Sequence, residues 1–116
     1  PFIVWGDGEQ SRAFQYVTDV VRAFPSAIER LPHAEPINLG TSDAIKIRKL
    51  AELILNLVDY KTPIQFDSSK PQGVKCRKAN ARRAVRELGW SPEVSLEEGL
   101  KTTIEWFTKN RRLGIP

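Results

Sequence analysis

The chain of 116 residues is long enough for one domain or one piece of a larger domain, and its 41% hydrophobic and 28% charged residues suit a folded protein with a hydrated surface. Its net charge of +4 is compatible with nucleic acid or with a smaller anionic ligand, and the single cysteine, Cys76, excludes an internal disulfide framework and a cysteine zinc cluster. No apolar run approaches the roughly 18 residues that cross a bilayer, and no signal peptide is visible, so we expect a cytoplasmic protein without a membrane partner. Because the chain begins with Pro1 rather than methionine, we expect a piece whose upstream part is missing.

The first third of the chain predicts a strand and an interrupted helix. Phe2–Trp5 is a short apolar run that ends in the turn Gly6–Gly8, which is typical of a buried strand. A helical pattern begins at Phe14, Pro25 is expected to end or kink it, and a second short helical piece is expected up to Leu31. The residues expected to face inward, spaced at i, i+3, i+4 and i+7, are Val17, Val20, Val21 and Phe24.

The middle of the chain predicts two further strands around a helix. Ile37–Gly40 is short and apolar, and we predict a strand there. Residues 47–58 carry the clearest apolar stripe of the sequence, which indicates a helix. Ile64–Phe66 alternates apolar and polar residues and is predicted as a strand, and Asp67–Gly73 has the composition of a loop.

The last third predicts two helices. Asn80 is expected to cap a helix over Ala81–Leu88 that stops at Gly89, and Ser95 with Glu98 forms a capping box that opens the final helix. The residues expected to be packed inward here are Ala84, Val85, Leu88, Trp90, Leu96, Leu100, Ile104, Trp106 and Phe107. The fold class is therefore α/β, with about three short strands and four or five helices. Three scattered strands do not make a complete Rossmann sheet, so we expect an apolar patch where this piece packs against something larger.

The known catalytic patterns are missing from this sequence. Gly6 and Gly8 are not followed by a third glycine at position 11, which argues against a dinucleotide-binding turn. No tyrosine is followed four residues later by lysine, and there is no nucleophile elbow, phosphate loop or zinc-protease motif. We therefore predict no catalytic, cofactor-binding or metal-binding residues, and no oxidoreductase activity from the isolated chain.

Four residues have the chemistry to hold a nucleoside diphosphate. Trp5 offers a ring face for a base, and Arg12, Lys70 and Arg77 offer cations for phosphate. Each also has a structural interpretation: Trp5 as a core residue, Arg12 as a cap for backbone carbonyls or a partner of a nearby aspartate, and Lys70 as a solvated loop residue.

Several motifs carry a family resemblance. The run WGDGEQSRAF at Trp5–Phe14, followed by YVTDVV at Tyr16–Val21, resembles the start of the substrate-binding region in extended short-chain dehydrogenases of the NAD-dependent epimerase/dehydratase family. Four later segments are similar to further motifs of that family and occur in the same order. They are PINLG at Pro36–Gly40, DSSKPQG at Asp67–Gly73, LGWSP at Leu88–Pro92 and the helix at Ser95–Trp106. The loops look most like those of the GDP-L-fucose synthase and GDP-mannose 3,5-epimerase members.

The resemblance implies that residues 1–116 are the C-terminal, nucleotide-sugar-binding region of an NAD(P)-dependent epimerase, reductase or dehydratase. It implies a GDP-sugar ligand held by Trp5, Arg12, Lys70 and Arg77, and NAD or NADP bound by an upstream Rossmann domain. Cys76 departs from the family pattern, since it stands where a basic residue is frequent.

Two other classes of function stay open. A non-catalytic module with this fold would bind a partner protein or form a homodimer through an exposed apolar face. A nucleic-acid binder would use the basic stretch Lys70–Arg86, but that stretch lacks interleaved aromatic residues, so we expect no nucleic-acid partner.

Overall fold

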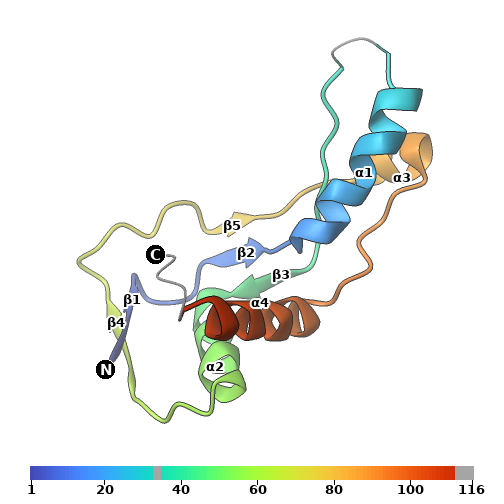
Figure 1. Cartoon of the computed structure of the whole chain (residues 1–116). Coiled ribbons are helices and arrows are strands. Elements are labelled where there is room, and N and C mark those ends of the chain that lie inside the picture. The colour runs from blue at the N-terminus through green and yellow to red at the C-terminus, as the bar shows by residue number, and fades with distance from the viewer. Residues whose placement is uncertain (33–34, 112–116) are drawn as a thin grey trace.

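The computed structural model describes residues 1–32 and 35–111. Five short strands and four helices in these residues are spread along an elongated body (Figure 1). Its radius of gyration is 17.0 Å, whereas a compact domain of this length has a radius of about 13 Å. The α/β class without a complete sheet is confirmed, although the sequence predicted about three strands rather than five.

The strands form two separate small sheets. In the first, β1 (Phe2–Trp5) pairs in parallel with β4 (Ile64–Asp67). In the second, β2 (Ser11–Ala13) lies between β3 (Ala44–Lys46), which is antiparallel to it, and β5 (Cys76–Arg77), which is parallel to it. Strands β2, β3 and β5 are only two or three residues long, which is too short for a periodic pattern to reveal them.

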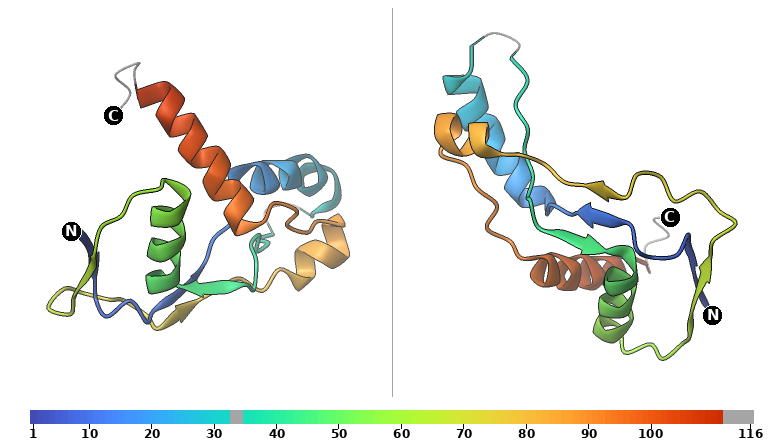
Figure 2. Two further views of the ribbon diagram at one scale, coloured as in Figure 1. Left: turned by 90° about the horizontal axis from the view of Figure 1, so that it is seen from below. Right: turned by 180° about the vertical axis from the view of Figure 1, so that it is seen from behind.

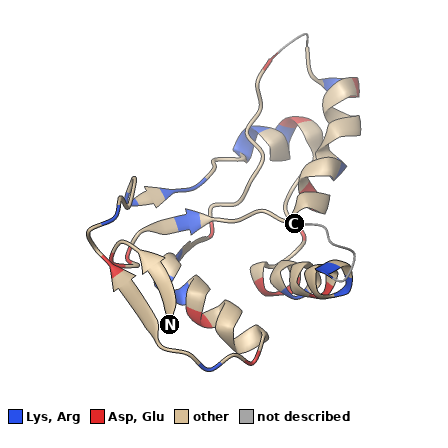
Figure 3. Cartoon of the chain, turned by 60° about the vertical axis from the view of Figure 1, so that its left-hand side comes forward, with Lys and Arg blue, Asp and Glu red and all other residues tan. Residues whose placement is uncertain are grey.

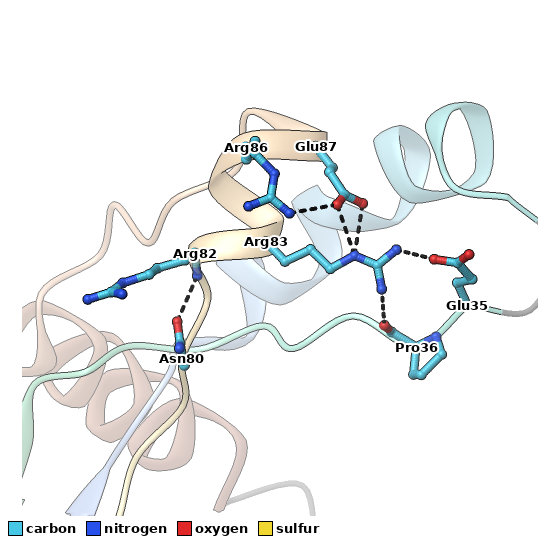
Figure 4. A network of polar contacts seen from close by, with 7 residues as sticks. All are labelled: Glu35, Pro36, Asn80, Arg82, Arg83, Arg86 and Glu87. Atoms are coloured by element: carbon cyan, nitrogen blue, oxygen red, sulfur yellow. Dashed lines mark hydrogen bonds and ion pairs between the residues drawn. The ribbon is translucent and has the colours of Figure 1, made fainter.

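The predicted strand at Ile37–Gly40 is wrong. Among the described residues, no strand pairs with this segment, and a strand needs a paired neighbour to satisfy its backbone groups. The segment is held instead by side chains: Ile37 and Leu39 pack against the core, and the carbonyl of Pro36 accepts a hydrogen bond of 3.1 Å from Arg83. Figure 4 shows Arg83 also paired with Glu35.

The four helices are α1 (Val17–Arg30), α2 (Ile47–Leu57), α3 (Arg82–Leu88) and α4 (Leu96–Asn110). As predicted, α4 begins where the Ser95 hydroxyl accepts a hydrogen bond from the Glu98 amide, and α3 ends at Gly89 with a φ of 64°. Asn80 accepts from the amide of Arg82, one residue earlier than a standard cap, because the helix begins after Ala81. No helix in the described part of the chain combines the length and apolar character needed to cross a membrane.

Helix α1 runs through Pro25, so of the two effects expected of this proline, an end or a kink, the end is wrong. Proline in a helix interior costs about 3 kcal/mol, because it removes one hydrogen bond and crowds the preceding turn. The opposite side of α1 offsets this cost, since Ala23 is fully buried against α3 in one cluster with Ala84, Leu88 and Trp90. Figure 1 and both views of Figure 2 place α1 and α3 side by side.

Asp19 connects α1 to the segment that leads into α4. Its carboxylate is almost fully buried and accepts hydrogen bonds from the side chains of Gln15 and Arg22 and from the backbone amides of Glu93 and Val94, at 2.8–3.1 Å. The indole of Trp90 donates to the Asp19 backbone carbonyl at 2.7 Å. Burial alone would raise the pKa of Asp19, but the bonds from Val94, Arg22 and Glu93 outweigh it and hold the pKa below its usual value.

One side of α1 is apolar and open to solvent. Val17, Val21, Phe24 and Ile28 repeat at i, i+4, i+7 and i+11, and all are more than half exposed. The prediction that the first three face the core is therefore wrong, because the buried face of α1 carries Asp19 and Ala23 instead. The inward placement of Val85, Trp106 and Phe107 is also wrong, since each is about half exposed. An exposed apolar patch was expected from the sequence, and this stripe places four exposed apolar side chains on one helix.

We predict that Asp19→Asn lowers the free energy of unfolding by about 2–4 kcal/mol, because the new amide group would face N–H donors inside the protein. Since the folded-state pKa of Asp19 is depressed, its contribution is complete above the unfolded value near pH 4 and disappears as the pH falls through the folded pKa. Urea unfolding at pH 7 and at pH 2.5 measures both effects, and the variant should differ less from the parent at the lower pH.

The control is Glu52→Gln, which removes an exposed pair with Lys49 on α2 and should change stability by less than about 0.5 kcal/mol. An Asp19→Asn protein as stable as the parent at pH 7 would show that the buried carboxylate does not hold α1 to the 90–94 segment.

Candidate functional site

Two chain turns meet at the carboxyl ends of the parallel strands β1 and β4. Trp5, the last residue of β1, is in register with Asp67, the last residue of β4. The amide of Gly6 donates to the Asp67 carbonyl at 2.8 Å, so the turn that follows β1 and the loop that follows β4 start side by side. The carboxyl ends of parallel strands are a common place for ligand sites in α/β folds.

Glycine is required where these two segments approach each other. Gly6 and Gly8 have φ values of 86° and 78°. A Cβ atom on Gly6 would lie 2.5 Å from Cγ of Gln72, and one on Gly8 would lie 2.4 Å from Cε1 of Phe66. The turn is fixed further by Gln10, whose side-chain amide donates to the Trp5 carbonyl at 3.2 Å.

The start of helix α2 supports the same turn. The amides of Ile47 and Arg48 donate to the carbonyls of Gln10 and Gly8, both at 2.9 Å, which satisfies two of the amides left open at a helix start. The guanidinium of Arg48 lies 4.1 Å from the centre of the Phe66 ring. Glu9 pairs with Lys46 at 2.7 Å and with Arg48 at 3.3 Å, and these two cations lower the pKa of Glu9.

Arg12 lies on β2 and reaches the loop that follows β4. Its Nη1 donates to the carbonyls of Ser11 at 2.7 Å and Val74 at 2.8 Å, and its Nη2 donates to the Gln72 carbonyl at 3.3 Å. This is the carbonyl-capping interpretation of Arg12. The aspartate alternative is wrong, because Arg12 has no carboxylate partner among the described residues and Asp19 pairs with Arg22.

The other predicted site residues lie on neighbouring segments, and of these only Arg77 is the direct strand neighbour of Arg12 among the described residues. Lys70 is exposed on the same loop, three residues beyond β4. Arg77 on β5 is in register with Arg12 on the neighbouring strand β2, and it lines a hollow of about 330 Å³ together with Lys78 and Asn80. Trp5 is 60% exposed, so the interpretation of this residue as part of the core is wrong.

The basic residues of the stretch Lys70–Arg86 divide into two groups. Arg83 and Arg86 are used structurally, because both pair with Glu87 and Arg83 also holds Glu35 (Figure 4). Within the described ranges, 1–32 and 35–111, no ion pair involves the remaining cations, which are Lys70, Lys75, Arg77, Lys78 and Arg82. Figure 3 shows this positive charge following the path from the end of β4 through β5 to α3.

Comparison with known proteins identifies the family. The family model described as GDP-mannose 4,6 dehydratase matches residues 1–103. GDP-L-fucose synthase 1 of Arabidopsis thaliana is 36% identical over 108 residues, which are 93% of this chain and 33% of that protein. The chain belongs to the NAD-dependent epimerase/dehydratase family of extended short-chain dehydrogenases.

Solved structures share the fold described above. The UDP-glucose 4-epimerase of Thermotoga maritima, solved with UDP-glucose, has a TM-score of 0.87 and 36% identity, covering 95% of this chain and 35% of that one. The UDP-glucuronic acid 4-epimerase of Bacillus cereus, solved with NAD, has a TM-score of 0.79 and 25% identity, covering 97% of this chain and 35% of that one. Another structure with this fold holds NADPH. The chain spans about a third of the length of the relatives that it matches.

The sequence named four candidate residues but did not reveal how Arg12 contacts the loop that carries Lys70. Gln72 and Val74 contribute carbonyls, and backbone atoms leave no trace in residue type. The loop is also stabilised by Asp67, whose Oδ1 accepts from the amide and the hydroxyl of Ser69. The signal for that turn was present, since aspartate followed two residues later by a backbone donor is a common loop start.

We predict that Gly8→Ala lowers stability by about 2–4 kcal/mol, because a left-handed backbone and an overpacked contact with Phe66 act together. Gly73→Ala is the matched control: its φ of 70° is similar, but the nearest atom to an added Cβ is 3.4 Å away. The control should therefore lose only about 1–2 kcal/mol of stability, because backbone strain acts there without the overpacked contact. Thermal unfolding of both variants measures the difference, and equal losses would mean that Gly8 is not needed for the close approach.

Proposed function

We propose that this chain is the nucleotide-sugar-binding part of an NAD(P)-dependent nucleotide-sugar epimerase, reductase or dehydratase, and that a GDP-sugar is its ligand. The observation that supports the proposal is the contact of β2 with the loop after β4: Arg12 bonds to the loop that carries Lys70, and its strand pairs with the strand that carries Arg77. A nucleoside diphosphate has the matching chemistry of a flat base and two negative phosphates.

Each residue has a part in this binding. The exposed ring of Trp5 gives the base a stacking surface, and the side chains of Lys70 and Arg77 neutralise the diphosphate. Binding through the nucleotide leaves the sugar free to enter a reaction centre on the remaining two thirds of the parent enzyme, where NAD or NADP supplies the hydride chemistry. The isolated chain would then bind nucleotide without turning over a sugar. A cytoplasmic location stays a prediction from the sequence.

The loop sequence supports a guanine nucleotide over nucleotides with other bases. DSSKPQG at Asp67–Gly73 resembles the GDP-L-fucose synthases, and the synthases of Arabidopsis thaliana and Escherichia coli K12 are 36% and 37% identical to this chain. Relatives named for UDP-sugars reach 42% identity over 106 residues, so base preference is a matter for direct measurement.

The first test is a titration of the 116-residue chain with GDP and UDP, followed by calorimetry and by tryptophan fluorescence. We predict that Lys70→Ala and Arg77→Ala each weaken GDP binding by about 1.5–3 kcal/mol, as expected for hydrogen bonds to a charged group. Lys61→Ala is the matched control, since Lys61 precedes β4 while Lys70 follows it, at the opposite end of the same strand. Equal affinity in all three variants, or no binding of either nucleotide at millimolar concentration, would contradict the proposed site.

The exposed stripe of α1 supports a role for the rest of the parent protein as a packing partner. Four large apolar side chains along 14 helical residues are exposed, and about two thirds of the relative's sequence lies outside the part that this chain matches. We assign the stripe to the contact with that remaining part, the upstream Rossmann domain. The alternative is a non-catalytic module that uses the same stripe to form a homodimer.

The double substitution Val21→Lys and Ile28→Lys separates these possibilities. In the isolated chain it should reduce self-association, measured by light scattering, because it covers apolar surface with charge. In a chimera where this chain replaces the matching third of the Arabidopsis synthase, the same double substitution should prevent the chimera from folding into a soluble protein. The control is the double substitution Val58→Lys and Val85→Lys, at two exposed residues outside α1, which should leave the chimera folded. A chimera that tolerates the α1 change would favour the dimer module.

A further inference from the structure

A second and larger hollow lies next to the one that Arg77 lines. It has a volume of about 660 Å³ and lies between residues 40–43 and residues 78–82, the segment that leads into α3. None of the four residues considered for the nucleotide lines it. Its volume is in the range of sites that hold small molecules, which typically measure about 300–1,000 Å³. The hollow is therefore a candidate for a second ligand.

The two segments that form this hollow are joined directly. The Ala79 amide donates to the Thr41 carbonyl at 3.2 Å, and a Cβ atom on Gly40 would lie 2.7 Å from Cβ of Ala79. The side-chain oxygen of Asn80 accepts a hydrogen bond of 3.2 Å from the Arg82 amide at the start of α3. The backbone around the hollow is therefore held in place before any ligand binds.

Lys78 and Arg82 give the lining of the hollow its positive charge. In the part of the chain that the structure describes, neither side chain forms an ion pair. Two other arginines of α3 differ in this respect, because Arg83 and Arg86 both pair with Glu87. Figure 4 shows Arg82 directed away from that network. Two cations beside one hollow are thus available to an anion.

The other residues of the lining restrict which anion fits. Asp43 is the one carboxylate among the described residues that line the hollow, so it disfavours a ligand that is negative over its whole surface. Val85, which is 53% exposed, and Ala81 and Pro92 add apolar surface. A ligand with a compact dianion at one end and an apolar body at the other matches both features. Phosphate is such a dianion, and arginine can bind two of its oxygens at once while lysine binds it as a point charge.

We propose that this hollow is a second anion site that binds a small organic phosphate. Lys78 and Arg82 hold the phosphate group, and the apolar surface of Ala81 and Val85 receives the body of the molecule. The proposal does not depend on the nucleotide site, because no residue assigned a role there takes part in this one.

A titration with phenyl phosphate tests the site, because this probe joins an apolar ring to a phosphate group with about two negative charges at pH 7.5. At constant ionic strength, it should shift the amide NMR signals of Thr41, Ala79 and Arg82 in the 116-residue chain. Phenol, which lacks the phosphate, should not shift them. Lys78→Gln and Arg82→Gln should each weaken binding at least threefold, and the double substitution at least tenfold, because each removes one charge that faces the phosphate.

The apolar part of the proposal has its own test. Inorganic phosphate should shift the same amides but bind more weakly than phenyl phosphate, because it has no ring to bury. Val85→Ser should weaken phenyl phosphate binding at least twofold and leave inorganic phosphate binding unchanged. Equal affinity of the two probes would overturn the role of the apolar surface.

Lys75→Gln is the matched control, since it removes the same charge from an exposed lysine that does not line the hollow. Its affinity for phenyl phosphate should stay within twofold of the parent's. A loss equal to that of Lys78→Gln would overturn the proposal, because it would reveal general attraction to the basic stretch. Binding that is lost in Arg77→Ala and kept in Arg82→Gln would also overturn it and assign the phosphate to the nucleotide site. Unshifted amides at millimolar probe would mean that the hollow binds no organic phosphate.

Discussion

The buried carboxylate of Asp19 is the interaction on which this fold depends most. In the described residues, only seven apolar side chains are buried, and the cluster around Trp90 is built largely from alanine and leucine, so the apolar core supplies little fixed geometry. Asp19 compensates because its two oxygens accept four hydrogen bonds: one from Gln15 just before α1, one from Arg22 on α1 and two from the segment before α4. Its backbone carbonyl also holds the Trp90 indole. A buried charge is tolerated only when it is fully hydrogen-bonded, and here that requirement specifies how α1 and the chain leading into α4 must meet.

The same scarcity of core explains why the molecule is elongated and leaves one side of α1 in water. Two sheets of two and three strands do not enclose a common interior, and the radius of gyration of 17.0 Å reflects elements that touch in pairs. A contiguous apolar stripe is unfavourable on a surface that stays hydrated, and α1 carries one in Val17, Val21, Phe24 and Ile28. Their spacing is the amphipathic pattern of a helix with two contact sides, of which α3 and Trp90 occupy one. A chain that matches a third of its relatives' length is expected to show such a surface.

The sequence predicted the elements that are determined by local patterns and missed the features that depend on contacts between distant segments. Strands β1 and β4 and helices α2, α3 and α4 were predicted because each carries its own periodic pattern or cap, as Ser95 does for α4. Ile37–Gly40 was wrongly predicted as a strand because a strand depends on a neighbour, and no local pattern reports whether one is present. Pro25 was given too much weight because tertiary burial of Ala23 outweighs a local penalty. The exposure of Val21 and Phe24 could not be predicted, since an apolar stripe looks the same whether its partner is in the chain or not.

The candidate site divides in the same way. The candidates Trp5, Arg12, Lys70 and Arg77 were predicted from residue type and family resemblance, and the strand register pairs the segment of Trp5 with β4 and that of Arg12 with β5. The role of Arg12 was left open by the sequence because its partners are the carbonyls of Gln72 and Val74, which every residue type possesses. Arg12 holds two carbonyls of this loop through bonds within the protein, so the loop has a fixed course beside β2 without any added partner. A site of this kind can keep its geometry on a fold with a small core, because hydrogen bonds across the loop replace the rigidity that apolar packing gives elsewhere.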